Sequence, residues 1–429
     1  MSHHMNKGII VAGAGVGINL ALGVLYAWSI FKDAIKASIG SGAPGAFDWN
    51  PASVNDPYAV ACLVFAFTMI LAGRMQDLAG PRITAATGGV LVSLGFALLS
   101  HSADYWIWVI GFGGLVGAGI AFGYAAVTPA ALKWFPPARS GLVTGVVVAG
   151  FGLASAYIAP LATYLVGHYG LLHTMLLFSA GVLATVLPLS LLLTVPAPRH
   201  TPAEAHAAAA KNPHLHHPEP HGPGCTMRLL KSGQFWLLWL LYFIGAGAGL
   251  MVIGSISGMA KLSMGESAFL AVAILAVGNA AGRILAGMLS DRFSRESVLA
   301  GVFLLQAALM FVAAFGLSSA SPLLIVCLAT LIGFNYGANL SLFPAFAKDM
   351  WGLRNFGANY GLLFTAWGVG GFVMSKLSAA LQAASGTYTT SFVVAGGLLL
   401  AGAVLPLLFM GEGKLSSWRK AKLTSALGA

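Results

Sequence analysis

The sequence has 429 residues, of which 58% are hydrophobic and only 8% are charged, with a mean hydropathy of +0.84. Soluble domains carry roughly 25% charged residues, so this composition excludes an ordinary soluble protein and predicts a membrane protein. The net charge of +10 could suggest a nucleic-acid partner, but the basic residues lie in short loops between apolar stretches, which disfavours a nucleic-acid surface.

Twelve apolar stretches follow one another along the chain, each close to the length of about 20 residues that crosses a bilayer as a helix. They lie at 8–31, 57–76, 83–101, 105–132, 140–166, 171–195, 234–259, 267–290, 297–317, 322–346, 356–383 and 388–410. We therefore expect an all-α membrane protein with twelve transmembrane helices in two six-helix bundles. The bundles cover 8–195 and 234–410, a cytoplasmic linker rich in Pro, His and Ala covers 196–233, and a cytoplasmic tail covers 411–429.

The distribution of lysine and arginine predicts the orientation, because cytoplasmic loops carry an excess of these residues. With the N-terminus in the cytoplasm, 17 of the 22 lysines and arginines fall on the cytoplasmic side and three fall outside. The remaining two, Arg283 and Lys376, lie inside apolar stretches. The pattern therefore predicts that both termini are cytoplasmic.

Two loop segments repeat one pattern, and each follows the second apolar stretch of its half. Residues 73–82 read GRMQDLAGPR and residues 287–295 read GMLSDRFSR. In both, an Asp lies four residues after a Gly, and a basic residue follows four or five positions later. An Asp at the membrane face can accept hydrogen bonds from the N-termini of neighbouring helices or pair with Arg across the loop. The repeat predicts tandem six-helix halves, with conformational loop residues Gly73, Asp77, Arg82, Gly287, Asp291 and Arg292.

Arg283 lies inside an apolar stretch, where its guanidinium stays protonated and costs at least about 2.5–3.5 kcal/mol on insertion scales. No Asp or Glu lies in any of the twelve stretches, so no carboxylate of the chain neutralises it there. Arg283 lies eight residues before Asp291, whereas the position eight residues before Asp77 holds Met69. The scaffold therefore does not need a cation at this position, and the pattern indicates that an anionic cargo supplies the counter-charge. The alternative is an arginine that extends to the inner interface.

Polar and aromatic residues near the centre of other stretches are further candidates for binding the cargo. Asn279 lies one helical turn before Arg283, on the same face. Tyrosines lie near Pro129 and Pro344, where a broken hydrogen-bond ladder frees carbonyl groups that tend to face a cavity, although packing within the helix bundle also explains a tyrosine there. Lys376 either contacts the cargo or extends to the outer surface. The candidate substrate-binding residues are Arg283, Asn279, Tyr124, Tyr336, Asn335, Lys376, Tyr26 and Trp28, with Trp367 and Phe364 as an apolar wall for a short alkyl chain.

The two loop segments resemble the loop signature of the major facilitator superfamily. Residues 122–152 read FGYAAVTPAALKWFPPARSGLVTGVVVAGFG, the eighth stretch contains GNAAGRILAGMLSD, the tenth contains LIGFNYGANLSLFPAFAKDMWG and the eleventh contains NYGLLFTAWGVGG. Together these resemble the oxalate:formate antiporter branch and its monocarboxylate-transporter relatives. The resemblance implies that the arginine of the eighth helix, here Arg283, binds the substrate carboxylate, and that the protein is a monomer.

Two departures from this branch bear on the cargo and on coupling. Oxalate-handling members place a second cation near the position that Trp367 holds here, so the resemblance leaves one central cation, which matches one carboxylate. Mammalian-type monocarboxylate carriers have an acidic residue where this chain has Asn279. An amide cannot take up a proton, so proton coupling through that position is disfavoured.

The sequence shows no pattern for catalysis, a cofactor or a metal. The segment GAGVG at 13–17 follows no strand and lies in an apolar stretch, which excludes a dinucleotide fingerprint. The linker histidines could bind a metal, but a solvated tract is the favoured reading; they are His200, His206, His214, His216, His217 and His221. No Ser–His–Asp, paired-carboxylate or Walker pattern is present, so we expect neither an enzyme nor an ATP-driven pump. Cys62, Cys225 and Cys327 lack metal or disulfide spacing.

Taken together, these features predict a secondary active transporter of small monocarboxylates such as lactate or pyruvate, in the inner membrane of a bacterium. Its expected partners are the cargo anion, a proton and the lipid bilayer. Two coupling modes stay open, which are symport of the anion with a proton and exchange of one anion for another. The alternative from a different class is a membrane receptor that transports nothing.

Overall fold

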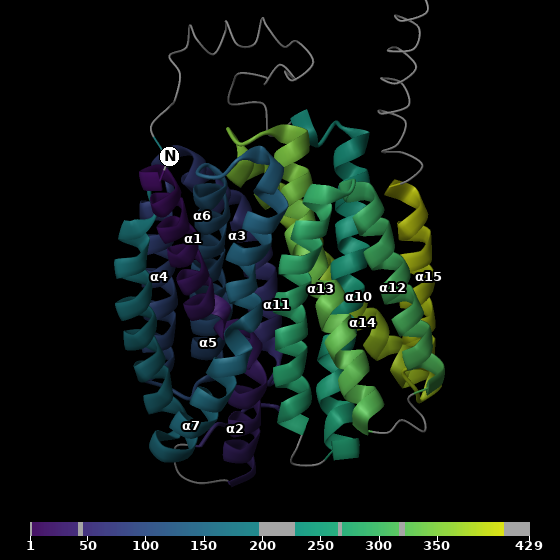
Figure 1. The fold of residues 1–429 in the computed structure, drawn as a ribbon. Coiled ribbons are helices and arrows are strands. Elements are labelled where there is room, and N and C mark those ends of the chain that lie inside the picture. The colour runs from purple at the N-terminus through teal and green to yellow at the C-terminus, as the bar shows by residue number, and fades with distance from the viewer. Residues whose placement is uncertain (1, 42–45, 197–227, 265–267, 317–321, 407–429) are drawn as a thin grey trace, which may run out of the picture.

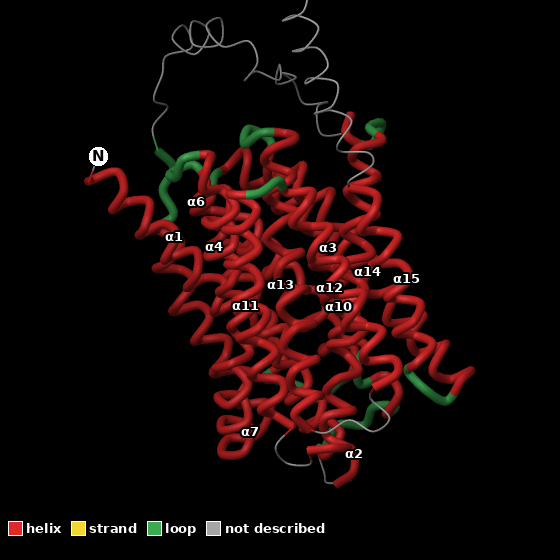
Figure 2. The backbone as a smooth tube through the Cα atoms, turned by 45° about the vertical axis from the view of Figure 1, so that its right-hand side comes forward, coloured by secondary structure: helices red, strands yellow, loops and turns green. Residues whose placement is uncertain are grey.

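The structure is a computed structural model that describes residues 2–41, 46–196, 228–264, 268–316 and 322–406. Most of the predicted linker, with its six histidines and Cys225, and the tail 411–429 lie outside these residues. The helices run side by side in one bundle and the loops gather at its two ends (Figures 1 and 2). The N-terminal half occupies one side of the bundle in Figure 1 and the C-terminal half occupies the other.

Helices account for almost all of the described backbone, and no strand occurs in it. The N-terminal half contains α1 (Ser2–Leu22), η1 (Gly23–Ala27), α2 (Trp28–Ser41), η2 (Pro51–Ser53), α3 (Asp56–Ala79), α4 (Pro81–Leu99), α5 (Tyr105–Trp108), η3 (Val109–Val116), α6 (Gly117–Leu132), η4 (Pro137–Arg139) and α7 (Ser140–Leu192). The C-terminal half contains α10 (Gly233–Met264), α11 (Ala268–Arg292), α12 (Arg295–Gly316), α13 (Pro322–Trp351), α14 (Phe356–Ser385) and α15 (Thr389–Leu405).

In the part of the chain that the structure describes, nine helical units are long and apolar enough to cross a membrane. One of them, 137–192, covers the predicted stretch 140–166 and most of the stretch 171–195, with Gly170 between the two. Gly170 has φ 76° and ψ 166°, a conformation that interrupts a helix and favours glycine. The all-α membrane architecture is confirmed, whereas the number of twelve spans stays a prediction.

Two predicted stretches are not regular α-helices throughout. The stretch 8–31 contains the 3-10 segment η1, and the stretch 105–132 contains η3, which is a π-helix. The two irregular segments lie close to each other, because Trp28, directly after η1, packs against Phe112 of η3 with ring centroids 4.5 Å apart. A Cβ at Gly23 would overlap the side chain of Ala154, so the irregular segment η1 lies directly against α7.

Both repeated loop motifs connect the two halves. We call the end of the bundle that carries Asp77 and Asp291 the inner end, following the predicted orientation. Asp77, near the end of α3, accepts hydrogen bonds from the backbone N–H groups of Gly357 (3.0 Å) and Ala358 (2.9 Å), at the start of α14. Asp291, near the end of α11, accepts from those of Gly141 and Leu142, both at 2.8 Å, at the start of α7. A carboxylate at a helix N-terminus satisfies free N–H groups and interacts favourably with the helix dipole.

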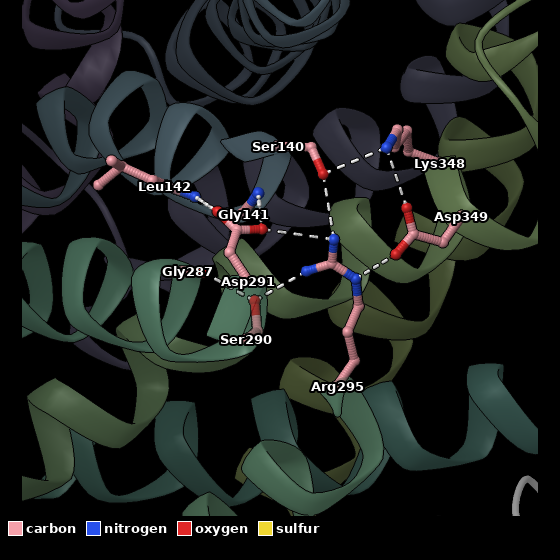
Figure 3. Close-up of polar contacts among 9 residues, drawn as sticks. All are labelled: Ser140, Gly141, Leu142, Gly287, Ser290, Asp291, Arg295, Lys348 and Asp349. Atoms are coloured by element: carbon pink, nitrogen blue, oxygen red, sulfur yellow. Dashed lines mark hydrogen bonds and ion pairs between the residues drawn. The ribbon is translucent and has the colours of Figure 1, made fainter. Parts of the chain in front are cut away.

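The second motif has an additional polar network (Figure 3). Arg295 pairs with Asp349 and with Asp291 (3.6 Å), and it donates to the hydroxyl groups of Ser290 (2.7 Å) and Ser140 (3.1 Å). Lys348 pairs with Asp349 at 3.1 Å and donates to Ser140 at 3.2 Å. The basic residue that acts in this motif is therefore Arg295, one turn after Asp291. Arg292, which we had also predicted, is exposed, and Arg82 donates to the carbonyl of Leu193 at 3.3 Å.

Glycines let the two halves approach at the same places. A Cβ at Gly73 would overlap the backbone carbonyl of Gly357, and a Cβ at Gly287 would overlap that of Gly141. Each contact lies one turn from the Asp of its motif. At each crossing between the halves, the Gly of the motif therefore makes a close backbone contact, and the Asp four residues later caps a helix of the other half.

Alanine at either of these glycines should destabilise the protein. Overpacking a tight contact costs about 1–3 kcal/mol, so Gly73→Ala and Gly287→Ala should each lower the unfolding temperature in detergent by several degrees. Gly114→Ala is the matched control, because a Cβ at that helical glycine meets nothing within 4 Å. Equal unfolding temperatures for all three variants would contradict the close contact.

Removing the charge of either motif Asp should open the inner end. We expect Asp77→Asn and Asp291→Asn to speed maleimide labelling of a Thr144→Cys reporter several-fold in a cysteine-free background, because Thr144 is fully buried in this structure. Asp104→Asn is the control. Asp104 also caps a helix, accepting from the N–H groups of Trp106 and Ile107, but these contacts lie within one half. Faster labelling in the control as well would show that the effect is not specific to the contacts between halves.

Candidate functional site

Arg283 connects the two halves of the bundle. It lies on α11 and its side chain is 0% exposed. Its Nε donates to the side-chain oxygen of Asn279 at 3.0 Å, one turn earlier on α11, and its Nη1 donates to the backbone carbonyl of Val148 on α7. Its Nη2 has no hydrogen-bond partner among the described residues. Two of the three guanidinium nitrogens, Nε and Nη1, are therefore hydrogen-bonded, and Nη2 is left to donate.

The charge of Arg283 is not balanced by an ion pair within the described residues. Arg283 is the only charged side chain among the buried residues that the structure describes. Ion pairs occur at the inner end, on Arg295 and Lys348. A buried cation without a carboxylate costs several kcal/mol, so this position is electrostatically prepared to receive an anion.

Small residues make room for this arrangement. A Cβ at Gly145 of α7 would overlap the backbone of Arg283, and a Cβ at Gly152 would lie 3.0 Å from the Arg283 Nε and 3.1 Å from the Asn279 Oδ1. On the other side, a Cβ at Gly337 of α13 would overlap the Asn279 carbonyl. Glycines of α7 and α13, the two helices that cross α11 here, thus shape the space around the guanidinium.

A buried aromatic cluster joins the halves beside this position. Phe65 of α3 packs against Phe364 and Trp367 of α14, with ring centroids 4.9 Å and 5.3 Å apart. Tyr124 of α6 packs against Phe364 at 5.6 Å, and the Trp367 indole N–H donates to the Tyr336 hydroxyl at 2.8 Å. The structure therefore brings together four of the predicted residues, which are Tyr124, Tyr336, Phe364 and Trp367.

Four members of this cluster were not predicted from the sequence, namely Phe65, Phe151, Tyr242 and Tyr360. Each is an aromatic residue in an apolar helix without a motif around it, and such residues usually pack against neighbouring helices. No sequence signal marks Tyr360 either, because the contact between the nearby Gly357 and the first loop motif becomes visible only in the fold.

Lys376 and Trp28 contact residues other than Arg283 and the aromatic cluster. Lys376 is exposed, with its ammonium group 5.9 Å from the centre of the Phe372 ring, which fits the alternative of a side chain that extends outward. Trp28 is buried against Tyr58, Trp108 and Phe112 and donates to Asn55 at 3.1 Å. Asn335 is buried and donates to the carbonyl of Leu331 on its own helix. The side chain of Tyr26 lies outside the described part of the structure.

A cavity of about 1080 Å³ lies at the inner end rather than at Arg283. Its charged lining includes Asp291, Arg295, Lys348 and Asp349, and these groups already pair with one another. It is therefore the recess around the polar network of the second motif, and we do not assign the cargo to it. No group of three or more metal-ligating His, Cys, Asp or Glu side chains occurs among the residues described.

Comparisons with known proteins agree with this architecture. The family model of the Major Facilitator Superfamily matches residues 8–375 and 261–427. The chain is 26% identical to the uncharacterized MFS-type transporter YhjX of Escherichia coli, over 82% of both chains. It is 23% identical to the oxalate:formate antiporter of Oxalobacter formigenes, over 87% of this chain and 84% of that protein. It is also 27% identical to monocarboxylate transporter 13 of Bos taurus, over 92% and 87%.

The fold is also that of solved transporters. The proton:xylose symporter XylE superposes with a TM-score of 0.75 at 14% identity, covering 95% of this chain and 96% of that one. FucP in its outward conformation gives a TM-score of 0.67 at 16% identity, covering 93% and 98%. These relatives and structures are transporters and not enzymes. The chain, with its two halves joined through repeated loop motifs, belongs to the major facilitator superfamily.

Proposed function

We propose that this protein is a secondary active transporter that moves small monocarboxylates of the lactate or pyruvate type, together with protons, by alternating access. The observation that carries the proposal is the buried Arg283, which contacts both halves and keeps one unpaired nitrogen. A guanidinium binds a carboxylate through parallel hydrogen bonds. A cargo bound to Arg283 therefore lies at the interface between the two halves.

The charge balance favours a cargo with one carboxylate. Arg283 supplies one positive charge, and a single carboxylate neutralises it. Trp367 occupies the position at which a second cation would favour a dicarboxylate, and its polar N–H group is already bonded to Tyr336. The rings of Phe65, Phe364 and Trp367 provide an apolar surface that suits a short alkyl group.

The coupling proton has no obvious protein carrier near Arg283. Among the buried side chains described, none is an Asp, Glu or His. In this proposal the proton therefore travels with the cargo anion, and each transfer carries no net charge across the membrane. The neutral amide of Asn279 orients the guanidinium without taking up a proton.

Anion exchange is a second candidate, and two observations favour it. One is the similarity to the oxalate:formate antiporter of Oxalobacter formigenes. The other is electrostatic, because an empty site leaves the Arg283 charge uncompensated in a medium of low dielectric constant, which disfavours return of the empty carrier. Uptake that needs a counter-anion inside the vesicle, and ignores a pH gradient, would support exchange over symport.

Loss of the Arg283 guanidinium should abolish transport. In proteoliposomes with an inward proton gradient, wild type should accumulate radiolabelled L-lactate, and Arg283→Gln should reduce the initial rate by at least about tenfold, since a hydrogen bond to a charged group contributes about 1.5–3 kcal/mol. Arg283→Lys keeps the charge but not the planar fork, so we expect an intermediate rate. Equal uptake by wild type and Arg283→Gln would place the cargo elsewhere.

The same substitution should leave the fold intact. Replacing a buried, incompletely paired charge with a neutral residue is often neutral or stabilising, so Arg283→Gln should unfold at the same temperature as wild type or a higher one in detergent. A residue kept for stability would give the opposite result. A marked fall in the unfolding temperature would therefore argue that Arg283 serves the structure.

A further inference from the structure

We propose that the hydroxyl groups of Tyr124, Tyr242 and Tyr360 form a second carboxylate-binding site, which takes the cargo from Arg283 on its way to the inner end. This inference rests on the proposed function, because it concerns the route of the same cargo. It adds a step to that function, since it assigns a binding role to two tyrosines that no sequence motif marks.

The three tyrosines form one buried group around a single ring. They come from α6, α10 and α14, and they are 3%, 0% and 3% exposed. Their ring centroids lie 5.6, 6.1 and 5.7 Å from that of Phe364. The hydroxyl of Tyr360 interacts with the hydroxyls of both Tyr124 and Tyr242. Three O–H groups therefore converge where the two halves meet, one from the N-terminal half and two from the C-terminal half.

This group lies between the cargo position and the inner end. Along α14, Gly357 binds Asp77 at the inner end, Tyr360 follows about one turn later, and Phe364 and Trp367 follow at further intervals of about one turn. On α14, Tyr360 is therefore closer to the inner end than Trp367, and it lies about one turn from the contact between Gly357 and Asp77.

Buried threonine hydroxyls continue in the same direction. Thr128 lies one turn closer to the inner end than Tyr124 on α6, and Thr144 lies one turn closer than Val148, the residue that binds Arg283 on α7. Both threonines are buried, and neither hydroxyl oxygen finds a partner in the described structure. The inner part of the bundle thus contains neutral polar groups at several levels and no buried carboxylate, within the residues described, that would repel an anion.

The chemistry of the site follows from its division between the halves. In this structure the tyrosine hydroxyls engage one another. When the halves separate at the inner end, Tyr124 moves away from Tyr242 and Tyr360, and the freed O–H groups can donate to carboxylate oxygens. Neutral donors hold an anion less tightly than a guanidinium does. The cargo can therefore leave Arg283 in steps, as successive weak sites allow in other transport pathways.

Removing single hydroxyls tests the proposal. Tyr242→Phe and Tyr360→Phe keep each ring against Phe364 and delete one donor. Each should lower the maximal rate of L-lactate exchange in proteoliposomes by about two- to tenfold, the range of one hydrogen bond. The equilibrium Kd, measured by calorimetry in detergent, should change by less than about twofold, because Arg283 holds the cargo at equilibrium. Tyr157→Phe is the control, since its hydroxyl donates to the Leu20 carbonyl at 2.9 Å within one half.

The outcomes separate this proposal from the proposed function. If wild type carries L-lactate and Arg283→Gln does not, the proposed function holds, and unchanged exchange rates in both tyrosine variants then overturn the second site alone. A Kd weakened as strongly as in Arg283→Gln would also overturn it, since the tyrosines would then belong to the Arg283 site. So would faster exchange with faster labelling of the Thr144→Cys reporter, because the hydroxyls would then only hold the halves together. Absence of L-lactate flux in wild type would overturn both proposals.

Discussion

The arrangement of this protein depends on one buried positive charge. Water cannot solvate the guanidinium of Arg283, and the surrounding helices supply only neutral acceptors, one amide and one backbone carbonyl. These acceptors fix its orientation and leave its charge unbalanced. Glycines of α7 and α13 provide the space, and aromatic rings from both halves pack against one another across the boundary between the halves. Under the proposed function, an anionic cargo balances this costly charge.

The two halves meet at the inner end through two related but unequal crossings. At each crossing a carboxylate caps the first helix turn of the opposite half and two glycines bring the backbones together. Among the residues that the structure describes, the crossing between α11 and α7 also carries ion pairs, through Arg295, Lys348 and Asp349. The internal duplication that the repeated loop segments predict accounts for the shared geometry. The difference suggests that the two crossings contribute unequally to closing the inner end, since ion pairs shielded from water strengthen one of them.

Several of these features could be predicted from the sequence, because each has a local physical signature. A cation in an apolar stretch identified Arg283, and spacing within the loops identified Asp77 and Asp291. The partners of these residues could not be predicted, because the N–H groups that cap Asp77 lie 280 positions away along the chain. Tyr242 and Tyr360 likewise resemble ordinary packing residues until the fold places them beside Tyr124. The irregular segments η1 and η3 have an apolar pattern that fits a regular helix equally well.

The aromatic contact between Phe65, Phe364 and Trp367 has a consequence for the membrane in which the protein lies. These rings fill the boundary between the halves while Arg283 places a fixed positive charge next to it. A sodium ion or a hydrated proton that entered would lose its solvation and meet electrostatic repulsion as well. Without bound cargo, the carrier is therefore expected to block the passage of cations. A cell can hold many copies of it without dissipating the ion gradients that drive its other transporters.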